Sequence, residues 1–136
     1  MYTHNYNIRI RYADTDQMGF VYYGKYATFY EIGRVEAMRA LGFSYKKLEE
    51  EGIMMPVLVN HSKYTLPAIY DELITIKTSI RSIPSVRIQF DYEIYNEANK
   101  LIHEGYTQLV FVRKVSGKPC RVPQQINDLL APYFGK

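Results

Sequence analysis

Residues 14–26, D-T-D-Q-M-G-F-V-Y-Y-G-K-Y, form the stretch that decides the fold of this chain. Two aspartates and a glycine come first, and apolar and aromatic residues then lead into a pattern of helical period. The pattern predicts a loop that feeds the N-terminus of a helix, where unpaired backbone amides and the helix dipole favour negative charge. We expect Asp16 to lie on that loop.

The helix that follows is predicted to bury one aromatic and small-residue face. Its stripe is widened by Phe29, and Gly42 stands where a helix is expected to end. The small residues of the stripe predict a close approach to a sheet, whereas Arg34, Glu36 and Arg39 fall off it. The stripe consists of Tyr26, Tyr30, Gly33, Ala37 and Leu41. A short second helix is expected over 44–51, with Ser44 as its N-cap.

Alternating apolar and polar residues predict the strands. The segments are 6–12, 55–66, 74–80, 86–94 and 101–112, and a short C-terminal helix is expected after Pro123. Gly105 inside the last strand predicts a bulge or a close approach. The order of elements indicates an α+β fold, with one antiparallel sheet wrapped around one long helix.

Composition narrows the class of protein. The chain has 136 residues, 47% hydrophobic and 23% charged, which predicts one globular domain over 1–136 and excludes a disordered chain. A net charge of +3 without a dense basic stripe gives no reason to expect nucleic acid. The single Cys120 excludes an internal disulfide and is typical of a reducing compartment. No apolar run has the length of a membrane span or a signal peptide, so we expect a cytoplasmic protein that does not bind membranes.

The segments Y-A-D-T-D-Q-M-G-F-V-Y-Y-G-K-Y (12–26) and Y-T-L-P-A-I-Y-D-E (64–72) resemble the hotdog-fold acyl-CoA thioesterases of the 4-hydroxybenzoyl-CoA thioesterase type. The similarity extends over nearly the whole chain. It implies a hotdog fold, hydrolysis of an acyl-CoA substrate, no metal or redox cofactor, and self-association into a homodimer that pairs further into a homotetramer.

The resemblance also implies roles for individual residues. Asp16 matches the family aspartate, which is either a general base or a nucleophile, and the backbone amide of Tyr23 matches the oxyanion donor. Many relatives carry histidine where this chain has Tyr23, so a side-chain acid or base is not expected there. Tyr26 is expected to touch the acyl pocket, and Val59 and Asn60 to line it.

The phosphates of coenzyme A call for cations near the mouth of the site. The turn between the two middle strands supplies candidates, and in the resembled family it helps to form the coenzyme A groove at a subunit interface. The candidates are Arg81, Ser82, Ser85 and Arg87, together with Arg113 and Lys114. An equally good reading is that these are solvated surface charges.

Other readings remain open. From residue type alone, Asp14 and Asp16 are turn residues whose side chains bond local amides. His61 and His103 are more typical of packed or surface histidines than of catalytic ones. Competing functions are a non-catalytic acyl-CoA or acyl-carrier-protein binding module and an acyl-thioester hydratase or dehydratase, although relatives of the latter kind use a histidine that the loop does not supply.

Overall fold

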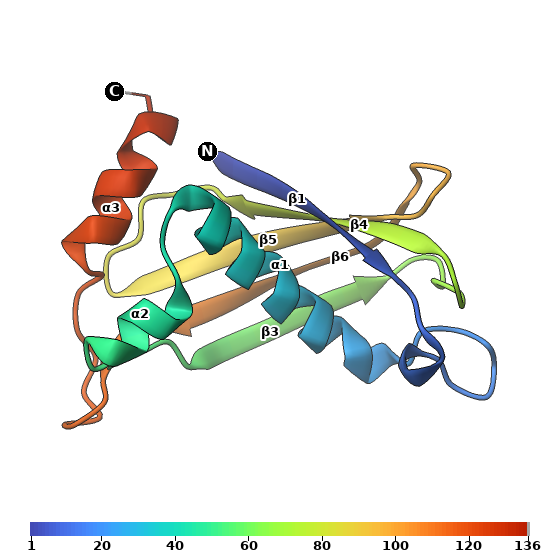
Figure 1. The fold of residues 1–136 in the computed structure, drawn as a ribbon, viewed down its shortest axis with the longest axis horizontal. Helices are drawn as coiled ribbons and strands as arrows, with labels where there is room; N and C mark the ends of the chain where they lie inside the picture. Colours follow the sequence, from blue (N-terminus) through green and yellow to red (C-terminus); the bar gives the residue numbers. More distant parts are fainter. Residues whose placement is uncertain (136) are drawn as a thin grey trace.

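A five-stranded antiparallel sheet wraps around one long helix in the computed structural model, which describes residues 1–135 (Figure 1). The helix α1 spans Tyr26–Leu41, and the 3-10 turn Tyr23–Lys25 leads directly into it. The strands, in spatial order, are β1 (Tyr2–Arg9), β4 (Leu73–Ile80), β5 (Arg87–Tyr95), β6 (Leu101–Val110) and β3 (Val57–Tyr64). The predicted α+β architecture is confirmed.

Shorter helices and strands lie at the two ends of the sheet and the long helix. They are the 3-10 turn Tyr12–Asp14, α2 (Tyr45–Glu50), the paired strands β2 (Ile53–Met54) and β7 (Val112–Arg113), α3 (Gln124–Leu130) and the 3-10 turn Ala131–Tyr133. The side chain of Ser44 accepts a hydrogen bond from the amide of Lys47 at 3.2 Å, as expected for the N-cap of α2.

The first strand begins and ends earlier than predicted. Its alternation continues to Tyr12 in the sequence, but the strand stops at Arg9. The amide of Ile10 instead donates to the carbonyl of Glu72 at 2.9 Å, and its own carbonyl accepts from Asp71. The chain therefore leaves the sheet at Ile10 and turns toward the loop that carries Asp16.

Close packing of α1 on the sheet depends on its small residues. A Cβ added to Gly33 would lie 2.7 Å from the hydroxyl of Thr78 and 2.9 Å from a methyl of Ile76 on β4. Ala37 is fully buried. These contacts confirm the predicted role of the small residues, because a larger side chain at Gly33 would force the helix away from the sheet.

Arg34 corrects the expectation that it lies off the buried stripe. It is only 8% exposed. Burial lowers the pKa of its guanidinium, but the nearby Tyr92, Tyr45 and Glu31 raise it, and the net shift is upward. Tyr92 belongs to strand β5 and Tyr45 is the first residue of α2, so Arg34 lies close to both the sheet and the start of α2. Its burial depends on residues outside its own helix, and the helical period does not report them.

One edge of the sheet is open. Strand β3 pairs with β6 on one side, and its residues are exposed except for the half-buried Ser62. No helix within residues 1–135 is long and apolar enough to cross a membrane.

Candidate functional site

Asp16 lies in a tight loop between the 3-10 turn at Tyr12 and the start of the long helix. Its Oδ1 accepts hydrogen bonds from the amides of Met18 at 2.9 Å and Phe20 at 3.4 Å. Its own amide donates to the carbonyl of Phe20 at 2.8 Å, and Gly19 takes the left-handed φ of 83° that closes the turn. The loop thus orients the carboxylate through one oxygen, while no protein hydrogen bond to the other, Oδ2, is found within residues 1–135.

The loop is fastened to the connection between β3 and β4. Phe20 forms a bridge with Ile69, and the amide of Val21 donates to the carbonyl of Ala68 at 2.8 Å. On the other side, buried Asp14 pairs with the ammonium of Lys25 at 3.1 Å. Asp14 is therefore committed to holding the loop against the helix start.

The start of the helix presents free donors. The amide of Tyr22 bonds the carbonyl of Asp14, and that of Lys25 bonds Tyr22. The amides of Tyr23 and Gly24 between them begin the 3-10 turn, and within residues 1–135 neither has a hydrogen-bond acceptor. Unpaired amides at the positive end of a helix favour an anion. The Tyr23 ring is 66% exposed and packs on Tyr22, with 4.7 Å between ring centroids.

Two neighbouring hollows border these groups. One, of about 330 Å³, has mostly apolar walls and is called the apolar hollow; it is lined by Asp16, Met18, Phe20, Val21, Tyr23, Tyr26, Tyr64, Thr65, Leu66 and Pro67. The other, of about 350 Å³, is called the polar hollow; it is lined by Tyr23, Gly24, Ala27, Asn60, Ser62 and Tyr64. No histidine is among the residues that line either hollow, all of which lie in the described part of the chain.

A buried polar cluster supports the wall of both hollows. The hydroxyl of Tyr30 is hydrogen-bonded to Ser62 Oγ at 2.7 Å and to Nε2 of His103. The His103 ring stacks on Tyr26, with 4.0 Å between centroids. Burial lowers the pKa of His103 to about 4, so the ring is neutral near pH 7. Burial likewise raises the pKa of Tyr26 to about 12, so Tyr26 keeps its proton.

The structure brings some of the predicted site residues together. Asp16, Tyr23 and Tyr26 border the apolar hollow, and Asn60 borders the polar one. Val59 lies on the same edge strand, 38% exposed, but borders neither.

The predicted coenzyme A residues lie elsewhere in the chain. Tyr2 pairs with Ile80 and Arg9 with Leu73, so the turn after Ile80 is at the opposite end of the sheet from Asp16. Arg81 pairs with Asp91 at 3.4 Å, and the carbonyl of Ser85 accepts from Val122. Ser82 and Arg87 share this end. Within one chain, therefore, the turn residues and Asp16 do not form one site.

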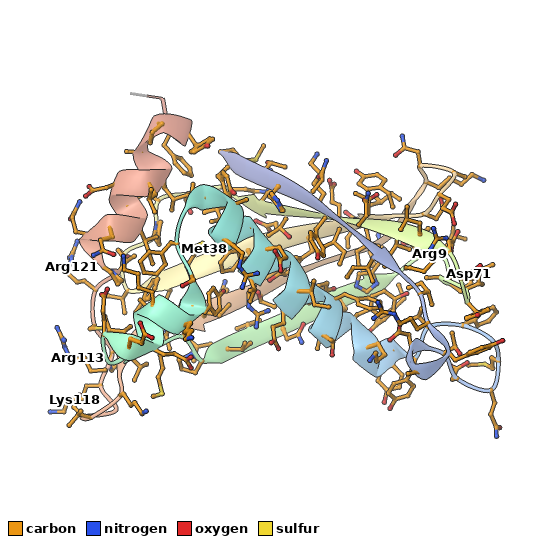
Figure 2. The ribbon with its side chains drawn as sticks, viewed as in Figure 1. Arg9, Met38, Asp71, Arg113, Lys118 and Arg121 are labelled. Carbon is orange, nitrogen blue, oxygen red and sulfur yellow. The ribbon has the colours of Figure 1, made fainter. Side chains whose placement is uncertain are left out.

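Other positive charges gather at that same end. Figure 2 shows the side chains of Arg113, Lys118 and Arg121 at the end that carries α2 and α3, far from Arg9 and Asp71 near the Asp16 loop. The group is exposed and has no carboxylate within salt-bridge distance in residues 1–135. Within the described part of the chain it forms an exposed, unpaired cationic surface.

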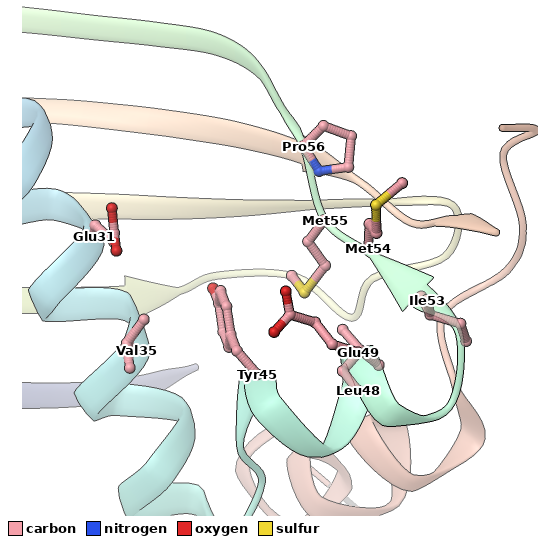
Figure 3. Close-up of a pocket in the computed structure, with 9 residues that line it drawn as sticks. All are labelled: Glu31, Val35, Tyr45, Leu48, Glu49, Ile53, Met54, Met55 and Pro56. Atoms are coloured by element: carbon pink, nitrogen blue, oxygen red, sulfur yellow. The ribbon is translucent and has the colours of Figure 1, made fainter. Parts of the chain in front are cut away.

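A larger hollow than these two lies away from the Asp16 loop. It has a volume of about 470 Å³ and lies between α1, α2 and the start of β3 (Figure 3). Its walls are Glu31, Val35, Tyr45, Leu48, Glu49, Ile53, Met54, Met55 and Pro56. Size alone does not identify the reacting centre, because this hollow contains neither Asp16 nor the free amides.

Sequence reasoning did not single out Tyr64, Ser62 or Phe20 as site residues. A signal was present for two of them. Asn60, Ser62 and Tyr64 alternate along one strand and so share a face. Because Asn60 was expected to line the pocket, this alternation could also have indicated Ser62 and Tyr64.

Comparison with known proteins gives the family. The Thioesterase-like superfamily matches residues 10–130. The acyl-CoA thioester hydrolase YbgC of Escherichia coli is 34% identical over 119 residues, which cover 88% of this chain and 89% of the relative. The solved DHNA-CoA thioesterase from Staphylococcus aureus is 34% identical with a TM-score of 0.90, covering 98% of this chain and 89% of its own. A mutant 4-hydroxybenzoyl CoA thioesterase complexed with 4-hydroxybenzoyl CoA shares the fold, with a TM-score of 0.85 at 18% identity, covering 95% of this chain and 99% of its own. The chain therefore belongs to the Thioesterase-like superfamily and is a thioester hydrolase of the hotdog fold.

Proposed function

We propose that this protein hydrolyses acyl-coenzyme A thioesters, with Asp16 as the reacting carboxylate and the backbone amide of Tyr23 as oxyanion donor. One observation carries the proposal. Asp16 and Tyr23 line the same apolar hollow, and within residues 1–135 Oδ2 of Asp16 has no protein hydrogen bond and the Tyr23 amide has no acceptor.

Two routes fit these groups. In one, Asp16 takes a proton from water as the water oxygen attacks the thioester carbonyl carbon. In the other, the carboxylate attacks that carbon and forms a mixed anhydride, which water then cleaves. Both routes break the carbon–sulfur bond and release coenzyme A as a thiolate that takes up a proton, and both yield the free acid.

The oxyanion formed on either route needs donors that are already in place. The amide of Tyr23, with that of Gly24 beside it, has no competing acceptor within residues 1–135 and lies at the positive end of α1. Loss of one such donor typically costs about 100-fold or more in rate. The donor is a backbone group, which is consistent with a tyrosine replacing the histidine of many relatives.

A second copy of the chain would complete the site. The open edge of β3 offers unpaired backbone groups, and Val57, Leu58 and Val59 on it are 46%, 49% and 38% exposed. Antiparallel pairing of two β3 edges about a two-fold axis covers this edge. It also turns the cationic end of one copy, with Ser85, Arg87 and Arg113, toward the Asp16 loop of the other, where coenzyme A phosphates need cations.

The direct test is release of free thiol from a panel of short-chain, long-chain and aromatic acyl-CoAs. Asp16→Asn should lower kcat by about 100-fold or more while the protein stays folded. Asp128→Asn on exposed α3 is the matched control, since it makes the same chemical change at the opposite end of the same chain, and it should keep wild-type kcat. Full activity in Asp16→Asn, or acyl-CoA binding without turnover in the wild type, would contradict the proposal.

The two-copy site has its own test. Light scattering should give at least twice the 16.0 kDa chain mass. Val59→Glu should reduce both the mass and the activity, because a charge on an edge strand opposes pairing. Arg87→Ala should raise KM more than it lowers kcat. An active monomer would remove the second copy from the site and leave the role of Asp16 intact.

A further inference from the structure

Two side chains border both hollows, those of Tyr23 and Tyr64. They meet where the hollows adjoin, and the Tyr64 hydroxyl donates to the carbonyl of Tyr23 at 3.4 Å. This contact joins the end of β3 to the start of the helix at the place where the two hollows adjoin.

The Tyr64 ring is held in this position although it is 52% exposed. Its ring packs edge-to-face with Tyr26, with 5.4 Å between centroids and an interplanar angle of 85°. It makes a second such contact with His103 at 4.9 Å and 77°. The His103 ring is itself fixed by stacking on Tyr26 and by its bond to Tyr30. Packing of this kind gives the ring a defined orientation.

The hollows on the two sides of Tyr64 differ in chemistry. The side that contains Asp16 is walled by Phe20, Val21 and Leu66, which suits the hydrocarbon part of an acyl group. The polar hollow on the other side is lined by the small residues Gly24 and Ala27 and by the hydrogen-bonding side chains of Asn60 and Ser62. Tyr64 lines both hollows and so stands at the border between the space beside Asp16 and this second space.

We propose that Tyr64 is a specificity-determining residue that limits the size of the acyl group by closing the passage from the apolar hollow to the polar hollow. The inference rests on the proposed function, because it assigns the apolar hollow to the acyl group. One methylene that fits or fails to fit a pocket changes kcat/KM by roughly 10- to 200-fold. The preferred substrates are accordingly acyl groups short enough to stop at Tyr64.

The test compares kcat/KM for butanoyl-CoA and decanoyl-CoA in the wild type, Tyr64→Ala and Tyr64→Phe. Tyr64→Ala removes the ring and opens the passage, so the decanoyl-to-butanoyl ratio should rise about tenfold or more. Tyr64→Phe keeps the ring and loses only the long bond to Tyr23, so the ratio should change by less than about threefold. Tyr6→Ala, an exposed tyrosine on the opposite edge strand, is the control and should leave the ratio unchanged.

The outcomes separate this inference from the proposed function. An active wild type whose ratio stays within about twofold in Tyr64→Ala would overturn the role of Tyr64 alone, since so small a change is well below the effect of one methylene. A wild type without turnover on any acyl-CoA would overturn the proposed function and this inference with it. If Tyr64→Ala does not fold, Tyr64→Leu also removes the aromatic ring, and the same rise in the ratio is expected.

Discussion

Gly105 is the position where a single added methyl group should do the most damage. A Cβ there would overlap the hydroxyl of Tyr30 and would lie 2.5 Å from the backbone carbonyl oxygen of His61. Neither Tyr30 nor the His61 carbonyl can shift easily to make space. Tyr30 is fully buried and stacks on Tyr92 at 4.2 Å, and the carbonyl of His61 belongs to the strand paired with Gly105.

The expected cost of Gly105→Ala follows from these contacts. Overpacking a core typically costs about 1–3 kcal/mol. Displacing Tyr30 also breaks its hydrogen bonds to Ser62 and His103, at about 1 kcal/mol each. We therefore expect the free energy of unfolding to fall by about 3–5 kcal/mol, or roughly 10–15 °C in Tm for a chain of this length.

Urea unfolding followed by circular dichroism measures this loss in a chain that has no tryptophan. Tyr30→Phe in the Gly105→Ala background removes the overlapping hydroxyl, so the two changes should couple favourably by about 1 kcal/mol or more. Glu104→Ala, the next residue along the same strand, should cost less than about 0.5 kcal/mol. A loss below about 1 kcal/mol in Gly105→Ala, or no coupling to Tyr30→Phe, would refute the reasoning.

Three further predictions concern stability. The pKa of folded His103 lies near 4, below the usual value of about 6.5. The stability that neutral His103 contributes is therefore complete above pH 6.5 and is lost as the pH falls toward 4. The wild type should lose up to about 3 kcal/mol of unfolding free energy over that window, and His103→Gln should lose less. Lys25→Met leaves the mostly buried carboxylate of Asp14 without its cation and should cost about 1–2 kcal/mol, measured by urea unfolding. Gly42 ends α1 at a φ of 112°, so Gly42→Ala should cost about 1–2 kcal/mol by thermal unfolding.

For each of these three predictions, one result would contradict the reasoning. Equal pH dependence in the wild type and His103→Gln would show that His103 does not titrate between pH 4 and 6.5 during unfolding. Wild-type stability in Lys25→Met would mean that water satisfies Asp14. For Gly42, Ala40→Gly inside α1 is the control for propensity, and a Gly42→Ala variant more stable than the wild type would contradict a left-handed helix end.

Much of the fold was predictable because it is local. The stripe from Tyr26 to Leu41, the stop at Gly42 and the alternation in β4 and β5 each report the environment of nearby residues. Arg34 was misread because its neighbours, Tyr92 of β5 and Tyr45 of α2, lie outside its own helix. A period along one helix records one buried face and contains no information about a second neighbour.

The candidate site divides in the same way. Asp16 and Tyr23 are close in sequence, so their loop and helix start were predictable together. Tyr30 and His103 are 73 residues apart, and their contact depends on the sheet wrapping around α1. Arg87 and Asp16 lie at opposite ends of the sheet, and no pattern in the sequence shows how far apart they are in space.

The fastening of the Asp16 loop to the β3–β4 connection has a consequence for protein engineering. Phe20 forms a β-bridge with Ile69, and the amide of Val21 donates to the carbonyl of Ala68, so two segments about fifty residues apart hold one another in place. If the loop were moved to another scaffold without residues 64–72, it would lose the backbone hydrogen bonds that hold it in place. Exchange of this loop between relatives should therefore succeed when both segments are moved as a pair and fail when either is moved alone.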